Sequence, residues 1–220
     1  MYDLPYHKEN NNEVIKDFIS KHPFALLSGV DDANRPVATQ VPLFFEKRGA
    51  KTYLSGHIMR STDHHKAFMQ NKQVLAVFTG NHTYVSGTWY TNPHTPSTWN
   101  YMSVHARGII HFLDGAALRN MLRKISLHFE NNNPDSPTAY DNLDPERMER
   151  IMKAIVAFEI EVTALDNVFK LSQDRDEQSY HNIINNLRER GDADSKAIAD
   201  EMEKRTELLL TKKHGRNKKP

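Results

Sequence analysis

The sequence predicts an α+β fold in which helices surround a small antiparallel β-barrel of about six strands. Segments rich in β-branched and aromatic residues recur up to residue 162, and most of them are joined by connections of hairpin length. Stretches with helical periodicity lie between some of these strands. The chain has no GxGxxG or GxxxxGK[ST] string, so a doubly wound nucleotide-binding sheet is not expected.

The elements of the first half follow from local pattern. Apolar residues at helical spacing predict a helix over 13–22, which Pro23 ends, and a second helix over 61–71. Residues 31–36, rich in Asp, Asn and Pro, are expected to close a hairpin. Strands are expected over 24–30, 37–45, 52–55, 73–79 and 83–86.

The second half alternates less regularly between strands and helices. Two prolines predict a loop over 91–98, and Gly108 is expected to mark a bulge or a bend in the strand that follows. Asp144 can cap a helix that has Pro145 at its first position. Strands are expected over 100–113 and 156–162, and helices over 116–130 and from 174 to about 210, with an interruption at 190–194.

The composition excludes several classes of protein. The absence of cysteine excludes disulfide frameworks, thiolate metal sites and cysteine nucleophiles, and it fits a reducing, cytoplasmic location. The longest apolar stretches are far shorter than the roughly 20 residues of a membrane-spanning helix, and the N-terminus has no signal-peptide pattern. The adjacent His64 and His65 would point about 100° apart on a helix, so no metal site is expected.

Charge is divided unevenly along the chain. The net charge is +1, but residues 212–220 hold five basic residues and no acidic one. The other 211 residues carry 24 basic and 28 acidic side chains, a net charge of −4. We therefore expect a body without a broad basic face, and a tail that is the one place for non-specific attraction to polyanions.

The first candidate site is the segment GHIMRST at 56–62, between a predicted strand and a predicted helix. Backbone N–H groups at a helix N-terminus point toward an anion, and Arg60 can pair with two phosphate oxygens. Ser61 or Thr62 can cap the helix and donate a further hydrogen bond. The segment indicates a phosphate site; the alternative is a surface arginine beside an ordinary helix cap.

Two further groups of residues lie downstream. Five aromatic rings fall within eighteen residues, namely Tyr84, Trp89, Tyr90, Trp99 and Tyr101. Such a cluster suits a planar heterocycle, although a packed barrel corner would use the same residues. Two cations and two neutral hydrogen-bonding groups then follow the last strand, namely Lys170, Ser172, Gln173 and Arg175. They can complete a phosphate or ring-edge site, or form a solvated helix entry.

These groups, in this order and at these separations, resemble the PaiB-type family of FMN-binding negative transcriptional regulators. The matching strings are GHIMR at 56–60, AVFTG at 76–80, YVS at 84–86, TWNY at 98–101, KLSQ at 170–173 and GDADS at 191–195, together with Met1, Tyr2, Pro5 and His7. The resemblance covers nearly the whole chain. Thr62-Asp63 stands where the family commonly has Asn-Pro, and Asp174 stands where it has Asn.

The resemblance implies a split β-barrel, as in pyridoxamine 5′-phosphate oxidase and flavin reductases, and a homodimer with FMN at the subunit interface. It implies contacts to the FMN phosphate for His57, Arg60, Ser61 and Thr62. Contacts to the flavin ring are implied for Trp99, Asn100, Tyr101 and His105. Lys170, Ser172 and Gln173 would close the site. A phosphate monoester carries about −1.5 to −2 charge, so two cations such as Arg60 and Lys170 are needed. Haem or another flavin in place of FMN stays open.

Three regions and two functions are expected. Residues 1–172 would form the FMN-binding split barrel, 173–211 a helical hairpin packed on the barrel or on the dimer partner, and 212–220 a disordered tail. The protein would be an FMN-binding negative regulator of transcription, or alternatively an FMN-dependent oxidoreductase of unknown substrate. The second helix of the hairpin is rich in acidic residues, which argues against its use as a DNA recognition helix.

Overall fold

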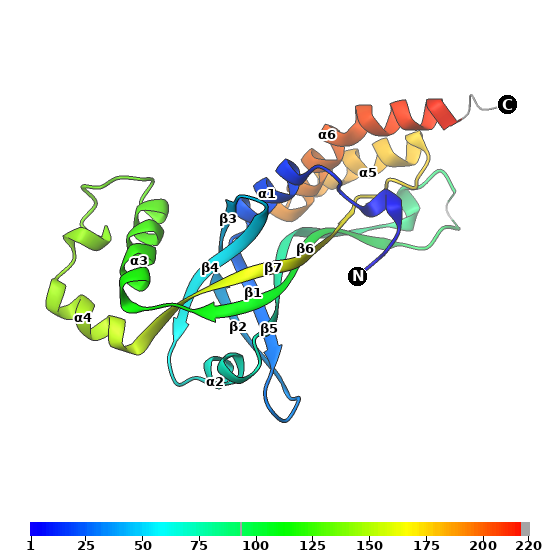
Figure 1. Cartoon of the computed structure of the whole chain (residues 1–220). Helices are drawn as coiled ribbons and strands as arrows, with labels where there is room; N and C mark the ends of the chain where they lie inside the picture. Colours follow the sequence, from blue (N-terminus) through cyan, green and yellow to red (C-terminus); the bar gives the residue numbers. More distant parts are fainter. Residues whose placement is uncertain (93, 217–220) are drawn as a thin grey trace. The chain divides into compact units, whose positions relative to one another are not determined.

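The computed structural model describes residues 1–92 and 94–216, with side chains described as far as residue 206 (Figure 1). Within these residues the helices are α1 (Asn12–Lys21), α2 (Asp63–Gln70), α3 (Gly115–Phe129), α4 (Pro145–Ala154), α5 (Glu177–Arg190) and α6 (Ala193–Arg216), with short 3-10 turns η1 (Pro5–His7), η2 (Gly87–Trp89) and η3 (Tyr140–Asn142). The strands are β1 (Phe24–Val30), β2 (Pro36–Pro42), β3 (Phe44–Arg48), β4 (Lys51–Met59), β5 (Gln73–Val85), β6 (Thr98–Phe112) and β7 (Ile155–Lys170).

The chain forms two compact units. Unit 1 comprises Met1–Ile15, Thr79–Val104 and Asp166–Pro220. Unit 2 comprises Lys16–Phe78 and His105–Leu165. The long strands β5, β6 and β7 each give one segment to each unit, so the units do not follow the order of the chain.

The strands form a seven-stranded sheet in the order β2-β1-β5-β6-β7-β4-β3. The registered pairs β1–β2, β1–β5, β3–β4 and β4–β7 are all antiparallel, which confirms the predicted class of split-barrel sheet. The count is seven in the described residues because the segment 37–45 is divided into β2 and β3, while the expected strands over 73–79 and 83–86 form the single strand β5. The Leu43 N–H still donates to Pro23 O at 2.8 Å, next to the Phe24–Pro42 pair of β1 and β2. Phe44 instead pairs with Ser55 of β4, so the chain changes partner at the buried Leu43.

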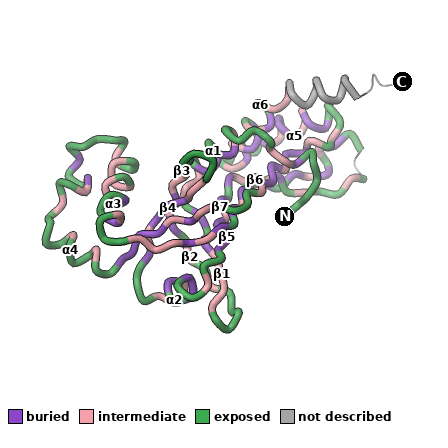
Figure 2. Tube along the Cα trace, in the orientation of Figure 1, coloured by how far each residue is buried: buried purple, intermediate pink, exposed green. Residues whose placement is uncertain are grey.

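The core of unit 2 lies inside its curled sheet. Large side chains that are fully buried there include Phe68, Phe78, Phe158, Leu27, Leu54 and Ile160. Figure 2 colours the buried stretches of the trace purple. α2 packs on β1 and β2, and β2 also contacts β4, although the two strands are far apart in the strand order. A Cβ at Gly56 would lie 3.0 Å from Pro42 O, so glycine allows the close approach of β4 to β2.

A helical segment of unit 2 lies between β6 and β7. Asp114 caps α3 by accepting from the Ala117 N–H at 2.8 Å, and Asp144 caps α4, with Pro145 at the first helical position as expected. α3 packs on β7 through a small apolar cluster that includes Leu118 and Ile155.

Unit 1 is organised around the α5–α6 hairpin. α5 ends at Gly191, whose φ of 79° lies in the left-handed region that glycine adopts readily, and this confirms the expected helix stop. Thr83 in β5 bonds to Ser195 at 3.0 Å, and Arg190 donates to Tyr84 O at 2.8 Å, so the hairpin packs on the end of β5.

The predicted tail begins inside α6, which continues to Arg216, and residues 217–220 lie outside the described residues. In the described part of the chain, no helix is both long and apolar enough to cross a membrane.

Candidate functional site

The predicted phosphate segment comprises the end of β4 and a tight turn, residues 60–62, that leads into α2 in unit 2. Thr62, rather than Ser61, caps α2: its hydroxyl accepts from the His65 N–H at 3.3 Å and donates to Met59 O at 3.1 Å. Ser61 adopts a left-handed backbone with φ 64°, a conformation that is uncommon for serine. Its N–H donates to His65 Nδ1 at 3.2 Å. Local bonds from α2 therefore hold the turn in place.

Arg60 is exposed and anchored at one edge. Its backbone N–H donates to Ala154 O at 2.8 Å, and its Nε donates to Ile155 O at 2.9 Å, where α4 meets β7. Within the described residues its two terminal nitrogens have no bonded partner. A guanidinium held in this way presents its outer N–H groups to an anion without losing much further side-chain freedom.

A cleft of about 310 Å³ opens beside this turn, also within unit 2. It is lined by Thr39, Gln40, Val41, Pro42, His57, Ile58, Met59, Thr62, His64 and Ile155. His57 Nδ1 is buried and has no hydrogen-bond partner among the described residues. Burial lowers the pKa of His57, so its ring is held neutral, with one nitrogen able to accept and one able to donate. An unsatisfied buried nitrogen in a cleft indicates a position for a polar ligand atom.

The other predicted residues gather mainly in unit 1, at the end of β7. Lys170 Nζ donates to Trp99 O at 2.7 Å and to Thr98 Oγ1, so the ammonium group is fixed against the start of β6. The Ser172 hydroxyl donates to Asn100 Oδ1 at 3.0 Å. Burial lowers the pKa of Lys170, an effect that Asp174 opposes and Arg175 reinforces. The segments TWNY and KLSQ thus meet, as their joint assignment to one site requires.

Asn100 and Ser172 point into the protein. Both side chains are buried, and the Asn100 amide also contacts Met202 Sδ in α6 at 3.5 Å. Ser172 has φ 60°, a second serine in the left-handed region. These two residues therefore join β6, the turn after β7 and α6, and their expected contact with a cofactor stays a prediction.

The aromatic residues divide into buried and exposed groups. Trp99 is 54% exposed and lies against His82 and Tyr84, with ring centroids 6.0 and 6.1 Å apart. Tyr90 is buried, and Arg175 lies over its ring at 4.5 Å. The exposed Trp99 surface offers a flat apolar wall in unit 1, as the heterocycle interpretation requires.

Tyr101 and His105 take positions of their own. Tyr101 is half-buried in the unit 1 part of β6. His105 is half-buried in the part of β6 that belongs to unit 2, so the two fall in different units. Their expected contacts with the flavin stay predictions.

Sequence reasoning missed the structural roles of three histidines. His64 and His65, considered only as a metal pair, instead bond to the turn: His64 Nε2 lies 3.0 Å from Thr62 Oγ1, and His65 accepts from Ser61. Their position directly after the cap was a signal available in the sequence. His7, 166 residues from its partner Gln173, had no local signal beyond its place in the family motif.

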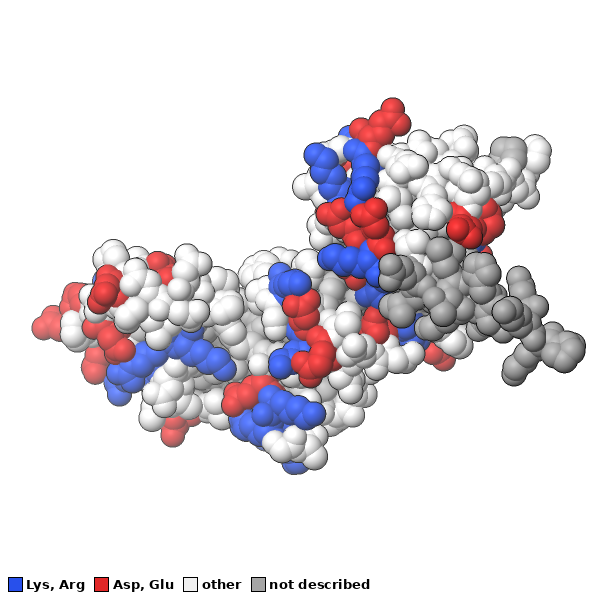
Figure 3. All heavy atoms as spheres, turned by 90° about the horizontal axis from the view of Figure 1, so that it is seen from above, with Lys and Arg blue, Asp and Glu red and all other residues white. Residues whose placement is uncertain are grey.

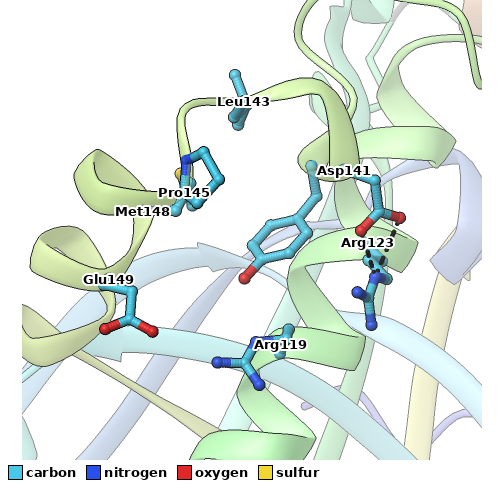
Figure 4. Close-up of a pocket in the computed structure, with 8 residues that line it drawn as sticks. Arg119, Arg123, Asp141, Leu143, Pro145, Met148 and Glu149 are labelled. Carbon is cyan, nitrogen blue, oxygen red and sulfur yellow. Dashed lines mark hydrogen bonds and ion pairs between the residues drawn. The ribbon is translucent and has the colours of Figure 1, made fainter.

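A second cavity, of about 200 Å³, lies between α3, η3 and α4 in unit 2 (Figure 4). Arg123 and Asp141 on its wall already bond to each other at 2.7 Å. None of the predicted cofactor residues lines this cavity. On the face shown in Figure 3, the described basic and acidic side chains are interspersed, in line with the charge distribution expected for the body of the chain.

Comparison with known proteins decides the family. The family model described as "Putative FMN-binding domain" matches residues 1–164, about three quarters of the chain. "Protease synthase and sporulation protein PAI 2" of Bacillus subtilis is 33% identical over 203 residues, which cover 92% of this chain and 97% of the relative. The chain belongs to the FMN-binding domain family. The predicted PaiB-type resemblance and the expectation of FMN as cofactor are thereby confirmed.

Solved structures support the fold of this FMN-binding domain. The FAD and heme binding protein from Mycobacterium smegmatis aligns with a TM-score of 0.55 at 18% identity, covering 74% of this chain and 72% of that one. The flavocytochrome from Azotobacter vinelandii aligns with a TM-score of 0.51 at 16% identity, covering 79% and 74%. At these identities the likeness concerns the fold.

The residues present fit FMN. The cleft of unit 2 offers an unsatisfied buried nitrogen on His57 and the N-terminal turn of α2, with the exposed guanidinium of Arg60 next to that turn in the chain. These are groups that bind a phosphate or the polar atoms of a flavin. When bound, FMN supplies a redox centre in its isoalloxazine ring.

Proposed function

We propose that the protein is a PaiB-type regulatory flavoprotein that holds the FMN phosphate at the turn between β4 and α2. The observation that carries this proposal is the cleft of unit 2, where His57 Nδ1 is buried without a partner among the described residues beside the cap of α2. Arg60 would pair with the phosphate through its outer nitrogens, while the Ser61 hydroxyl and the backbone N–H of Thr62 would donate from the turn. His57 would hold a polar atom of the cofactor.

The phosphate assignment is supported by charge. No carboxylate pairs with Arg60 among the described residues, so its charge is available to a ligand. As the PaiB-type resemblance implies, Lys170 would be the second cation that a phosphate monoester needs. Its ammonium is oriented by Trp99 O within unit 1. Trp99, Tyr101 and His105 remain the proposed neighbours of the flavin ring.

The cofactor test begins with the colour and spectrum of the purified protein. We expect FMN absorbance and release of FMN on denaturation. Arg60→Ala should weaken FMN binding by about tenfold or more, because a hydrogen bond to a charged group contributes about 1.5–3 kcal/mol. Arg35→Ala is the matched control, since Arg35 is an exposed arginine paired with Asp31 in the β1–β2 turn. Protein that stays colourless with added FMN would refute the proposal.

The regulatory role is supported by the relative, which is named for protease synthesis and sporulation. We propose that this chain also represses transcription, as the PaiB-type resemblance implies. A reporter under the promoter of a protease gene, with and without the gene for this protein, tests the role. Repression that is lost in Arg60→Ala would link regulation to FMN; unchanged expression would argue against regulation. Oxidation of NADH by the FMN-loaded protein would instead favour the oxidoreductase alternative.

We also propose that the working form is a cytoplasmic homodimer with FMN at the subunit interface. Support comes from the PaiB-type resemblance, whose members are normally dimers of this kind. The exposed Trp99 and Tyr84 rings are apolar surface that a dimer could cover. Light scattering on the FMN-loaded protein should give twice the mass of one chain, about 51 kDa, because one chain has 25.4 kDa. A mass of one chain would contradict the dimer.

A further inference from the structure

The side chain of Gln173 is used within the protein. Its Oε1 accepts from the Leu171 N–H at 2.8 Å, and its Nε2 donates to Phe169 O. These bonds close the turn 170–173 around the amide group. Ser172 lies in this turn with φ 60°, a conformation that persists only where the surroundings enforce it. Gln173 therefore supports the backbone that carries Lys170 and Ser172.

The same amide oxygen has a second partner, His7. His7 Nδ1 lies 3.1 Å from Gln173 Oε1. An amide oxygen only accepts, so Nδ1 carries the proton and donates. The His7 side chain is 3% exposed, and Tyr6 packs edge-on against its ring at 4.4 Å. Burial lowers the pKa of His7, against the opposing effect of the bond to Gln173.

The chain around His7 is tied down by other contacts in unit 1. The Glu9 N–H donates to Asn167 Oδ1 at 2.8 Å, and Asn167 Nδ2 donates to Glu9 O at 3.0 Å. Lys8 pairs with Asp166 at 2.6 Å, and Glu9 pairs with Arg205 at 2.6 Å. Because these contacts do not involve the imidazole, replacing His7 removes one bond to the turn while the segment stays attached.

From these contacts we infer that the N-terminal segment 1–9 is part of the cofactor site, with His7 as a positioning residue that acts through Gln173. His7 and Gln173 hold the 170–173 turn in the shape that presents Lys170 to FMN. In this role neither residue needs to touch the cofactor, because both set the position of Lys170. The inference rests on the proposed function, since it assigns this turn to the FMN site.

The test is a double-mutant cycle read by FMN affinity, measured as quenching of flavin fluorescence on titration with protein. His7→Ala should weaken FMN binding about three- to tenfold, since a hydrogen bond contributes about 0.5–1.5 kcal/mol. Gln173→Ala should weaken it at least as much. The double variant should bind FMN like Gln173→Ala alone, within about twofold, because His7 acts through that amide.

Two variants separate positioning from general loss of structure. His7→Asn restores an N–H donor and should recover most of the affinity. His22→Ala removes a half-buried histidine just after α1, whose ring lies against Phe18 with centroids 4.6 Å apart, and should leave the FMN affinity within about twofold. If His7→Ala does not fold, His7→Asn and Gln173→Ala still test the inference, and wild-type affinity in Gln173→Ala overturns it.

The failures of the two proposals are distinguishable. Wild-type protein that binds no FMN refutes the proposed function. Wild-type protein that binds FMN while folded His7→Ala binds it equally well overturns only the role of His7. Losses that add in the double variant would show that His7 does not act through Gln173, which also overturns the inference.

Discussion

The backbone N–H of Ser61 donates to Nδ1 of His65 at 3.2 Å, so a buried histidine of α2 fixes the turn that precedes its own helix. This bond requires Nδ1 to be unprotonated. It also satisfies an N–H group in a residue whose left-handed φ of 64° is otherwise unfavourable. The conformation of the proposed phosphate turn is thereby coupled to the protonation state of one imidazole.

The first prediction concerns pH. Burial lowers the pKa of His65 below its ordinary 6.5, and the positive charge of Arg60 acts in the same direction. Below about pH 6.5 the unfolded chain therefore takes up a proton that the folded chain does not, and the free energy of unfolding decreases as the pH falls. Burial shifts His7, His22 and His57 in the same direction.

His65→Gln should flatten this decrease, because the new side chain does not titrate. Urea unfolding at several pH values between about 5.5 and 7.5 measures how steeply the free energy of unfolding changes with pH. A variant whose stability falls with pH as steeply as that of the wild type would show that His65 is not among the groups responsible.

The second prediction concerns the cap of α2. Thr62→Ala removes the acceptor for the His65 N–H and should lower the free energy of unfolding by about 1 kcal/mol. Thr62→Ser keeps the hydroxyl and should lie within about 0.5 kcal/mol of the wild type. Equal stability of the alanine and serine variants in urea unfolding would show that the cap contributes nothing.

Much of the secondary structure was predictable because its signals are local. Asp144 before Pro145, and Gly191 between two helical stretches, mark helix ends through backbone chemistry that depends on few neighbours. The division of 37–45 into two strands was not predictable from the same kind of pattern. It depends on a change of partner: Leu43 still bonds to Pro23 beside the β1–β2 pairs, whereas Phe44 pairs with β4, and the local pattern does not mark this change.

The contacts within the candidate site were likewise not predictable from local sequence. The composition of TWNY and KLSQ indicates polar chemistry, but not whether a polar group faces a ligand or the protein. Asn100 bonds to Ser172, 72 residues away, and lies against Met202, 102 residues away. Such partners are fixed by the fold, so residues expected to line a cofactor can instead hold its surroundings together.

The third prediction concerns Gly108, where a bulge or a bend was expected. A Cβ there would lie 2.4 Å from Glu161 O and 2.5 Å from Ile160 Cγ2, so glycine permits the close approach of β6 to β7. Gly108→Ala should lower the free energy of unfolding by about 2–3 kcal/mol through overpacking. Gly115→Ala is the matched control: its Cβ meets nothing within 4 Å at the start of α3, so the change should be neutral or stabilise by up to about 1 kcal/mol. Equal effects of the two substitutions would contradict this account.

The fourth prediction concerns the ion pair that ties the N-terminal segment to α6. Arg205 bonds to Glu9 at 2.6 Å and to Glu201 at 2.7 Å, and the side chains of Arg205 and Glu9 are only 17% and 13% exposed. Arg205→Met leaves the half-buried Glu9 carboxylate without its cation and should cost about 2–3 kcal/mol at neutral pH. Arg188→Met removes an exposed arginine that pairs with Asp200 and Glu203, and should cost less than about 1 kcal/mol.

The pH dependence of the stability lost in Arg205→Met identifies the cause of that loss. Burial raises the pKa of Glu9, but hydrogen bonds from Arg205 and from backbone N–H groups outweigh it, so the pKa is lowered in the folded protein. A carboxyl group of this kind stabilises the fold above its unfolded pKa, about 4.5, and the contribution is lost as the pH falls through the folded value. In Arg205→Met the opposing effect of Arg205 is absent and Glu9 is neutralised at a higher pH. The gap in unfolding free energy between wild type and variant should therefore narrow from pH 7 to pH 4, whereas a constant gap would mean that lost packing of Arg205 on the Phe169 ring causes the destabilisation.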